Sequence, residues 1–356
     1  MMEWSQNGRT LRLTVSAGSV RARMPGGWRL EDVHPSVLAV AGWLLLSQVL
    51  PEECPDYREI LALPHRKPGS VDLLSFSGGA DSLAALLLSD ALPVYLARSY
   101  DCYPWHGSTA RLGSTVAVER LVAEVGAVVV ESDFEKLGLM VGLRHGFRDG
   151  YGYGALIALL ADHYDAGVLS FGGILDTIWM GTGDLSAAGS RYVDIANAPG
   201  GVWARHRALF AVAGLAMSLP VGGCSETITV KLAPQGVSCP KVADDGTPCG
   251  ACFKCFRKEQ LLGRRAEAAR VRTHLTHRPL KMATTVIHGC HMVGAFPPEL
   301  EEFRDVETSW TERHYDRSLD VLCPPPQAAT ARARLAARGV QPMTDDDVRV
   351  MQGFLQ

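Results

Sequence analysis

The sequence predicts an α/β protein built on a doubly wound parallel sheet. Short apolar runs alternate with helix-like segments from residue 71 onward, and a glycine-rich turn joins the first run to an apolar helix. The runs are continuously apolar, as expected for strands that are buried on both faces of a parallel sheet. Strands that alternate with helices in this way are typical of βαβ units.

Residues 1–70 precede this alternation and are expected to form an accessory β/α segment. Residues 10–15 and 20–24 each alternate between apolar and polar side chains, and an Ala-Gly-Ser sequence between them can turn the chain. This pattern predicts a β-hairpin. The apolar stretch at residues 35–50 predicts a buried helix, and residues 51–70 are rich in proline and charge, as expected of a connector.

The alternating region, residues 71–235, is expected to form the main α/β domain. Its apolar runs predict strands at 71–76, 93–97, 127–131, 167–171 and 227–232. The intervening segments predict helices at 82–88, 108–125, 153–164 and 205–219. A loop-like, cysteine-rich element follows at residues 236–262, and residues 263–356 are typical of an accessory, mostly helical segment.

The composition is that of an ordinary globular protein. Of 356 residues, 47% are hydrophobic and 21% charged, and the formal net charge is only -3. A nucleic-acid-binding protein usually carries a basic excess, so nucleic acid is not an expected partner. The longest apolar stretch, residues 37–50, falls short of the roughly 20 residues that cross a bilayer, and the first residues lack the apolar run of a secretion signal. We therefore expect a cytoplasmic protein with no membrane segment.

The strongest local signal is the sequence Ser-Gly-Gly-Ala-Asp-Ser, which lies between a predicted buried strand and a predicted helix. Two glycines let the backbone turn sharply, and the amides of the turn and of the first helical turn can then point toward one anion. Asp81 would repel a phosphate unless a divalent cation lay between them, so it is a candidate Mg²⁺ ligand. The alternative is a plain turn with a capped helix, but the complete pattern favours phosphate binding. The candidate binding residues are Ser77, Gly78, Gly79, Ala80, Asp81 and Ser82.

Four of the nine cysteines form a second signal, with nine, two and two residues between them: Cys239, Cys249, Cys252 and Cys255. An odd total argues against a disulfide framework. Two-residue spacers let neighbouring sulfurs reach one ion, and four thiolates complete the tetrahedron of a structural Zn²⁺ site. An iron–sulfur cluster is the main alternative, because Cys-x2-Cys-x2-Cys also occurs in ferredoxins.

Together, these two motifs resemble the N-type ATP pyrophosphatases, whose pyrophosphate loop (PP-loop) has the pattern Ser-Gly-Gly-x-Asp-Ser after the first strand of a Rossmann-like sheet. Within that superfamily, Cys followed by Cys-Gly-x-Cys-x-x-Cys and a basic residue is similar to 7-cyano-7-deazaguanine synthase. The resemblance covers residues 71–258, and the segments 1–70 and 259–356 depart from it.

The resemblance implies an activity and a set of ligands. ATP would bind at the carboxyl ends of the strands, with its β- and γ-phosphates and Mg²⁺ held by the glycine turn. A substrate oxygen would attack the α-phosphate and release pyrophosphate, and the four cysteines would hold structural zinc. The implied enzyme is a carbon–nitrogen ligase that adenylates a small-molecule carboxylate or amide, with a 7-deazapurine or an altered substrate as the candidates, before ammonia or an amine displaces AMP.

Several further positions are candidates. By topology, the carboxyl end of the second strand, at Leu96, Ala97 and Arg98, is expected to meet the adenine. The resemblance implies that the end of the fourth strand lies beside the ribose and α-phosphate, where Gly172 and Gly173 would let backbone approach the ligand. Two side chains are catalytic candidates together with Asp81: Asp176, which could orient substrate or metal, and Lys231, which could neutralise charge on the transferred phosphate. A solvated Asp in a turn and a solvated surface Lys are the alternatives.

Two other classes of function remain open from the sequence. One is a tRNA-modifying PP-loop enzyme, either a thiolase or an amidine-forming ligase. The other is a non-catalytic, nucleotide-sensing subunit of a larger complex. The sequence names neither the acceptor nor the nitrogen donor, and it is compatible with a homodimer.

Overall fold

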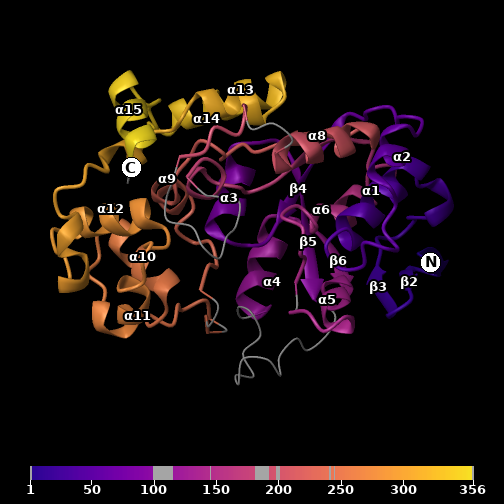
Figure 1. Ribbon diagram of the computed structural model, residues 1–356, viewed down its shortest axis with the longest axis horizontal. Helices are drawn as coiled ribbons and strands as arrows, with labels where there is room; N and C mark the ends of the chain where they lie inside the picture. The colour runs from indigo at the N-terminus through magenta and orange to yellow at the C-terminus, as the bar shows by residue number, and fades with distance from the viewer. Residues whose placement is uncertain are drawn as a thin grey trace.

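A computed structural model of the 356-residue chain describes residues 2–98, 115–144, 146–180, 192–197, 201–239, 242–243 and 245–354. Figure 1 shows β4, β5 and β6 near the middle of the molecule, with β2, β3 and the N-terminal helices α1 and α2 at one end and α10, α11 and α12 at the other. The strands are β1 (Glu3–Asn7), β2 (Thr10–Val15), β3 (Gly18–Arg23), β4 (Val71–Phe76), β5 (Leu92–Arg98), β6 (Val128–Ser132), β7 (Ala166–Ser170) and β8 (Ala216–Ser218). They form one sheet in the order β1-β2-β3-β6-β5-β4-β7-β8.

The helices are distributed along the whole chain. Up to β8 they are α1 (Pro35–Leu46), α2 (Tyr57–Leu61), α3 (Ala80–Leu87), α4 (Thr115–Glu124), α5 (Leu137–Met140), α6 (Gly154–Ala158), α7 (Leu175–Ile178) and α8 (Val202–Val212). After it come α9 (Glu226–Leu232), α10 (Phe253–Leu261), α11 (Arg272–Leu275), α12 (Ala283–Val293), α13 (Arg317–Leu322), α14 (Pro325–Ala337) and α15 (Asp345–Gly353). None of the helices in the described part of the chain is long and apolar enough to cross a membrane.

The α/β class and the mostly parallel sheet are confirmed. Strands β4 to β8 pair in parallel, and strand β4 lies between β5 and β7. The chain therefore adds β5 and β6 on one side of β4 and β7 and β8 on the other. In open α/β sheets, a crevice for ligands forms at the carboxyl ends of the strands where the order reverses in this way, which here is between β4 and β7.

The sheet separates two apolar cores because neighbouring strand residues point to opposite faces. Leu73 packs with side chains of α1, α6 and α8 on one face. Leu74 packs with side chains of α3, α4 and α14 on the other face. Strands β4 and β7 lie between these layers and are largely buried on both sides, as expected for apolar strands of a parallel sheet, whereas Val129 of β6 is 45% exposed.

The N-terminal hairpin belongs to this sheet. Strand β3 pairs antiparallel with β6, and β1, which the sequence did not indicate, pairs with β2. Strand β1 has the sequence Glu-Trp-Ser-Gln-Asn, whose weak apolar alternation explains why it was missed. The predicted helix at 35–50 is shorter than expected and ends at Leu46. Of the predicted helix 108–125, residues 108–114 lie outside the described part of the chain.

The predicted strand at residues 227–232 is wrong, since this segment is helix α9. Its run of Thr, Ile, Thr and Val has high β propensity, but the Ser225 side chain caps the helix by accepting a hydrogen bond from the Ile228 amide (3.3 Å). Residues 227–230 are all buried, so the helix lacks the polar face that marks an amphipathic helix in a sequence. Tertiary packing here overrides local propensity.

The predicted helix at 205–219 also combines two elements. Helix α8 ends at Val212, and the last strand, β8, follows at Ala216–Ser218. Gly214 makes the break with a φ of +66°, and a Cβ at this position would lie 2.5 Å from the Arg66 carbonyl oxygen. The apolar run continues through both elements because both are buried, which concealed the boundary.

Candidate active site and metal centre

The glycine turn lies between β4 and α3 at the reversal point of the sheet. Gly78 has a φ of +76°, a conformation that side-chain-bearing residues rarely adopt, and Gly79 is the N-cap of α3. The Ser82 hydroxyl accepts a hydrogen bond from the Ser77 amide (3.2 Å) and lies 3.1 Å from the Ser77 hydroxyl. These contacts hold the two hydroxyls side by side at the start of a helix, where amides and the helix dipole favour an anion.

Two amides of the turn make long hydrogen bonds to hydroxyls. The Gly79 amide donates to the Ser77 hydroxyl at 3.4 Å, and the Ala80 amide donates to the Ser238 hydroxyl at 3.3 Å. Bonds of this length are weak compared with the usual 2.9–3.0 Å. An anion could therefore replace the hydroxyls as the acceptor with a gain in hydrogen-bond strength.

Two other glycines let neighbouring backbone approach the turn. A Cβ on Gly172, just after β7, would lie 2.9 Å from the Ser82 nitrogen and Cα. A Cβ on Gly236 would lie 2.5 Å from the Ala80 nitrogen and Cα. The start of α3 is therefore clamped between the end of β7 and the segment that leads into the cysteine loop, because neither neighbour carries a side chain.

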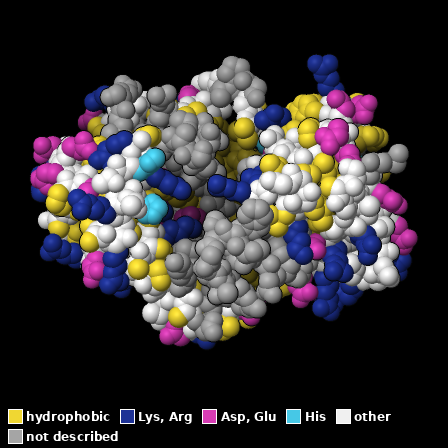
Figure 2. Space-filling model, turned by 60° about the horizontal axis from the view of Figure 1, so that its bottom comes forward, with side chains coloured by type: hydrophobic (Ala, Val, Ile, Leu, Met, Phe, Trp, Pro, Cys, Tyr) yellow, Lys and Arg dark blue, Asp and Glu magenta, His cyan; other side chains and the backbone are white. Residues whose placement is uncertain are grey.

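A cavity of about 520 Å³ opens over the turn, within the roughly 300–1,000 Å³ of small-molecule sites. From the turn it is lined by Ser77, Gly79, Ala80, Asp81 and Ser82, and from β5 and the segment that follows β7 by Leu96, Ala97, Arg98 and Gly172. Seen from below the view of Figure 1, the molecule has a hollow near its middle that is bordered by Lys and Arg side chains (Figure 2). The structure thus brings most of the predicted nucleotide-binding residues to one place.

The remaining cavity residues were not singled out in the sequence. Aromatic and aliphatic side chains form much of the wall, among them Phe76, Tyr95, Val118, Phe147 and Tyr153. The cavity residues at the end of β6 could have been predicted from the sequence, because the carboxyl ends of parallel strands lie at the same edge of a sheet. Ser238 and Lys254 could not, since only the tertiary fold carries the cysteine loop to the glycine turn.

Asp81 faces the cavity from the first turn of α3. Its carboxylate accepts a hydrogen bond from the Thr229 hydroxyl (2.7 Å), which comes from α9. Burial and the nearby Glu226 carboxylate raise the pKa of Asp81 to about 7, although the Thr229 hydrogen bond opposes this rise. A carboxyl group held in this state is a ready ligand for a divalent cation, which would displace its proton.

Asp176 is buried beneath this site rather than exposed to the cavity. Its carboxylate accepts hydrogen bonds from the hydroxyls of Thr284 (2.7 Å) and Thr285 (2.9 Å) and from the Glu226 amide (2.7 Å). Burial raises its pKa. These contacts join α7, α9 and α12, so the geometry assigns Asp176 to the support of the site and does not place it against a ligand.

Arg257 supplies positive charge to this buried network. Its guanidinium makes two hydrogen bonds of 3.0 Å to the carboxylate of Glu226, and the side chains are only 7% and 12% exposed. The fork-to-fork geometry is that of a strong charge-assisted pair. Helix α10 is thereby fixed to α9, the helix that also carries the hydroxyl partner of Asp81.

The structure does not bring Lys231 to the cavity. It lies on α9 rather than on a strand, and its ammonium contacts the Glu312 carboxylate at 2.6 Å. It does not line the cavity, and neither does Gly173, whose Cβ position faces the side chain of Ile178. Gly78 contributes through its conformation and through its carbonyl, which accepts a hydrogen bond from the Val237 amide (2.7 Å).

Arg98 lies at the cavity wall, paired with Glu135. Its Nε contacts one carboxylate oxygen, and its Nη2 donates to the other at 3.0 Å. Both residues line the cavity. Because its charge is largely balanced by Glu135, Arg98 is better placed to orient a ligand than to neutralise a phosphate.

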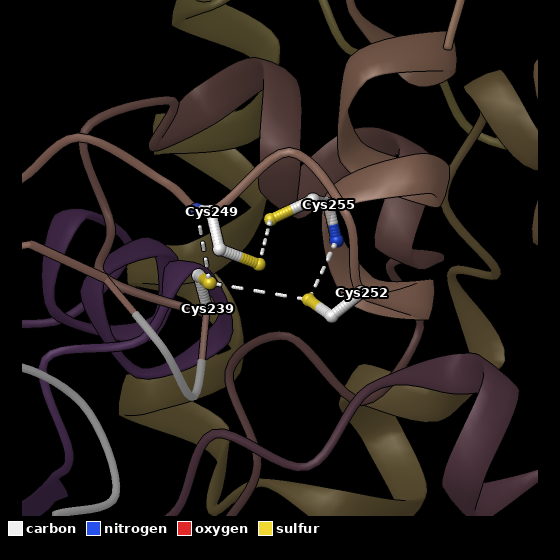
Figure 3. A group of neighbouring side chains, drawn as sticks. All are labelled: Cys239, Cys249, Cys252 and Cys255. Atoms are coloured by element: carbon white, nitrogen blue, oxygen red, sulfur yellow. Dashed lines mark hydrogen bonds between the residues drawn. The ribbon is translucent and has the colours of Figure 1, made fainter. Parts of the chain in front are cut away.

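The four clustered cysteines form a site that could hold a metal ion such as zinc (Figure 3). Their sulfurs all lie within 4.8 Å of one another, with 3.9 Å between Cys239 and Cys252 and 3.8 Å between Cys249 and Cys255. Zn–S bonds of about 2.3 Å in a tetrahedron place the sulfurs about 3.8 Å apart. The geometry fits one ion, whereas a four-iron cluster binds each sulfur through a different iron and needs a wider spacing.

The fold and the site together define an α/β protein with a mostly parallel sheet, a glycine-turn cavity at its reversal point, and a tetracysteine centre beside that cavity. In a comparison with protein families, residues 205–355 match a family that is described as a family of unknown function (DUF6395). That match includes most of α8, the cysteine loop and the C-terminal helices, but not the glycine turn. No curated protein and no solved structure matches the chain.

Proposed function

We propose that this protein is an ATP-dependent carbon–nitrogen ligase of the pyrophosphate-loop type, which binds ATP in the glycine-turn cavity and adenylates a carboxylate or amide substrate. The observation that carries the proposal is the turn itself. A positive-φ glycine, paired serine hydroxyls and the N-terminus of α3 converge on one wall of a ligand-sized cavity at the reversal point of the sheet.

The cavity suits the parts of a nucleotide. The hydroxyls of Ser77, Ser82 and Ser238 and the amides of the turn would hold the β- and γ-phosphates. The apolar and aromatic wall that includes Phe76 and Tyr95 offers burial to a purine, and the backbone of residues 96–98 offers polar groups to its edge. Asp81 would ligate Mg²⁺, which when bound neutralises charge on the phosphates.

The proposed chemistry has two balanced steps. A substrate oxygen forms a bond to the α-phosphorus while the bond between the α-phosphorus and the bridging oxygen breaks, and pyrophosphate leaves with that electron pair. Ammonia or an amine then attacks the activated carbon, loses a proton, and expels AMP. The amides of the turn act on the first step, because they are already aimed at the group that gains negative charge as pyrophosphate leaves.

The metal centre has a structural role in this proposal. Four thiolates fill a tetrahedron and leave no position open for substrate. The loop that they hold contributes Val237 and Ser238 to the cavity wall next to the turn. The metal would thereby keep the nucleotide-binding wall folded.

Pyrophosphate release tests the proposal directly. Purified zinc-loaded protein is incubated with Mg·ATP, ammonium and a panel of carboxylates that includes 7-deazapurine carboxylates, and AMP and pyrophosphate are measured. Substrate-dependent formation of both, lost in Asp81→Asn, is the expected result. Binding of ATP with no turnover on any member of the panel would favour a nucleotide-sensing role, and absence of ATP binding would refute the proposal.

A further inference from the structure

The loop that carries the metal ligands forms one wall of the cavity. Val237, Ser238 and Cys239 from this loop line it, and so does Lys254, which lies between the ligands Cys252 and Cys255 in the first turn of α10. The segment is joined to the glycine turn by two hydrogen bonds, one from the Val237 amide to the Gly78 carbonyl and one from the Ala80 amide to the Ser238 hydroxyl. A side chain on this loop is therefore positioned relative to the turn by the metal site.

The first turn of α10 has a fixed orientation. The sulfur of Cys252 caps it by accepting a hydrogen bond from the Cys255 amide (3.4 Å). Phe253 is buried, with the Arg257 guanidinium 4.9 Å from its ring centre and the His274 ring stacked at 5.0 Å. Residues 253 and 257 share the inward face of the helix, so Lys254, about 100° further round, projects away from that face and its side chain reaches the cavity.

Lys254 is also distinct in its charge environment. Among the described residues that line the cavity, the cations are Arg98 and Lys254, and the acids are Asp81 and Glu135. Arg98 is paired with Glu135, as described above. Lys254 is exposed and makes no ion pair within the described ranges, and its charge lies close enough to Asp81 to oppose the rise that burial causes in the pKa of that carboxyl.

We propose that Lys254 binds the phosphate chain of the nucleotide, so that the metal loop supplies the cation that the glycine turn lacks. The assignment rests on the proposed function, because it takes a polyphosphate as the ligand of the cavity. It replaces the role that the sequence predicted for Lys231, whose charge is paired with Glu312 outside the cavity. An ammonium at this position complements hydroxyls and amides that are neutral, and it stabilises charge that moves toward the leaving pyrophosphate.

Binding measurements on the zinc-loaded full chain test this assignment. Isothermal titration calorimetry with Mg²⁺ and the non-cleavable analogue α,β-methylene-ATP, and separately with Mg·pyrophosphate, compares wild type with Lys254→Met, which keeps the alkyl chain but removes the charge. Lys254→Arg retains the charge. Lys67→Met is the matched control, because Lys67 is exposed and precedes β4, at the opposite end of the strand from the cavity.

We expect Lys254→Met to weaken both ligands by about tenfold to hundredfold, the range for loss of a charge-assisted hydrogen bond. Lys254→Arg should recover part of this loss, and Lys67→Met should bind like wild type. Zinc content and the thermal midpoint of each variant check that the loop is intact. Wild-type affinity in Lys254→Met would overturn the assignment, whereas failure of the wild type to bind either ligand would instead refute the proposed function.

Discussion

Replacing Gly172 by alanine is expected to disturb the site without adding polarity or charge. The new Cβ would lie 2.9 Å from both the nitrogen and Cα of Ser82 and 3.1 Å from the Asp81 carbonyl carbon. Carbon atoms in contact are normally 3.5–4.0 Å apart, so the strand end and the start of α3 must separate by roughly 0.5–1 Å. All three obstructing atoms are backbone, and no rotamer change can relieve the clash.

Overpacking of this kind typically costs about 1–3 kcal/mol of the free energy of unfolding. The displaced residues, Asp81 and Ser82, are those proposed to hold Mg²⁺ and phosphate, so nucleotide affinity should fall by more than about tenfold, because binding geometry tolerates little displacement. Gly172 has no positive φ, so the effect would come from contact alone.

Gly173→Ala is the matched control. Its Cβ would meet only side-chain carbons, at 3.2 Å and 3.4 Å from Ile178 and 3.5 Å from Leu219, and the ends of these side chains can shift. We expect it to cost less than about 1 kcal/mol and to leave affinity unchanged. Urea unfolding and calorimetric titration with Mg·α,β-methylene-ATP provide the two readouts. Equal effects of the two substitutions on affinity would refute the close-approach argument.

Three further predictions concern the groups around the turn. The pKa of Asp81 is raised to about 7, against 3.8 for the ordinary group, so the folded protein holds a proton that the unfolded chain releases. The free energy of unfolding should therefore fall as pH rises from about 4 to about 7. In urea titrations, Asp81→Asn should reduce this pH-dependent fall in the free energy of unfolding by up to a few kcal/mol. An unchanged pH dependence would contradict the raised pKa of Asp81. Cys252→Ser should lose bound zinc by elemental analysis and lower the thermal midpoint, because metal-binding energy is folding energy, whereas Cys54→Ser, outside the cluster, should keep one equivalent. Arg257→Met should lower the free energy of unfolding by about 3–5 kcal/mol, because it leaves the Glu226 carboxylate buried without its partner. The double variant with Glu226→Gln should recover part of this loss. Additive effects of the two substitutions would argue against an interaction between the two side chains.

The sequence by itself determined the class of the fold and the identity of two local motifs. Strands β4 to β7 were found because each is a short, continuous apolar run, and the glycine turn and the tetracysteine loop were found because their residues are close together in the chain. In such motifs the chemistry depends on spacings of a few residues, which the chain fixes covalently. That is why the cysteine cluster assembled as expected and why all the turn residues except Gly78 line one cavity.

Tertiary structure alone decided which distant residues meet. Helix α9 has the composition of a strand, and only its enclosure among α3, α10 and α12 makes the helix stable. Asp176 was diverted into a buried network and Lys231 into an ion pair by residues far along the chain, and Lys254 was carried into the cavity by the packing of α10. The physical reason is the same in each case: burial and charge pairing are set by neighbours in space, and a linear sequence records those neighbours only where they are also neighbours in the chain.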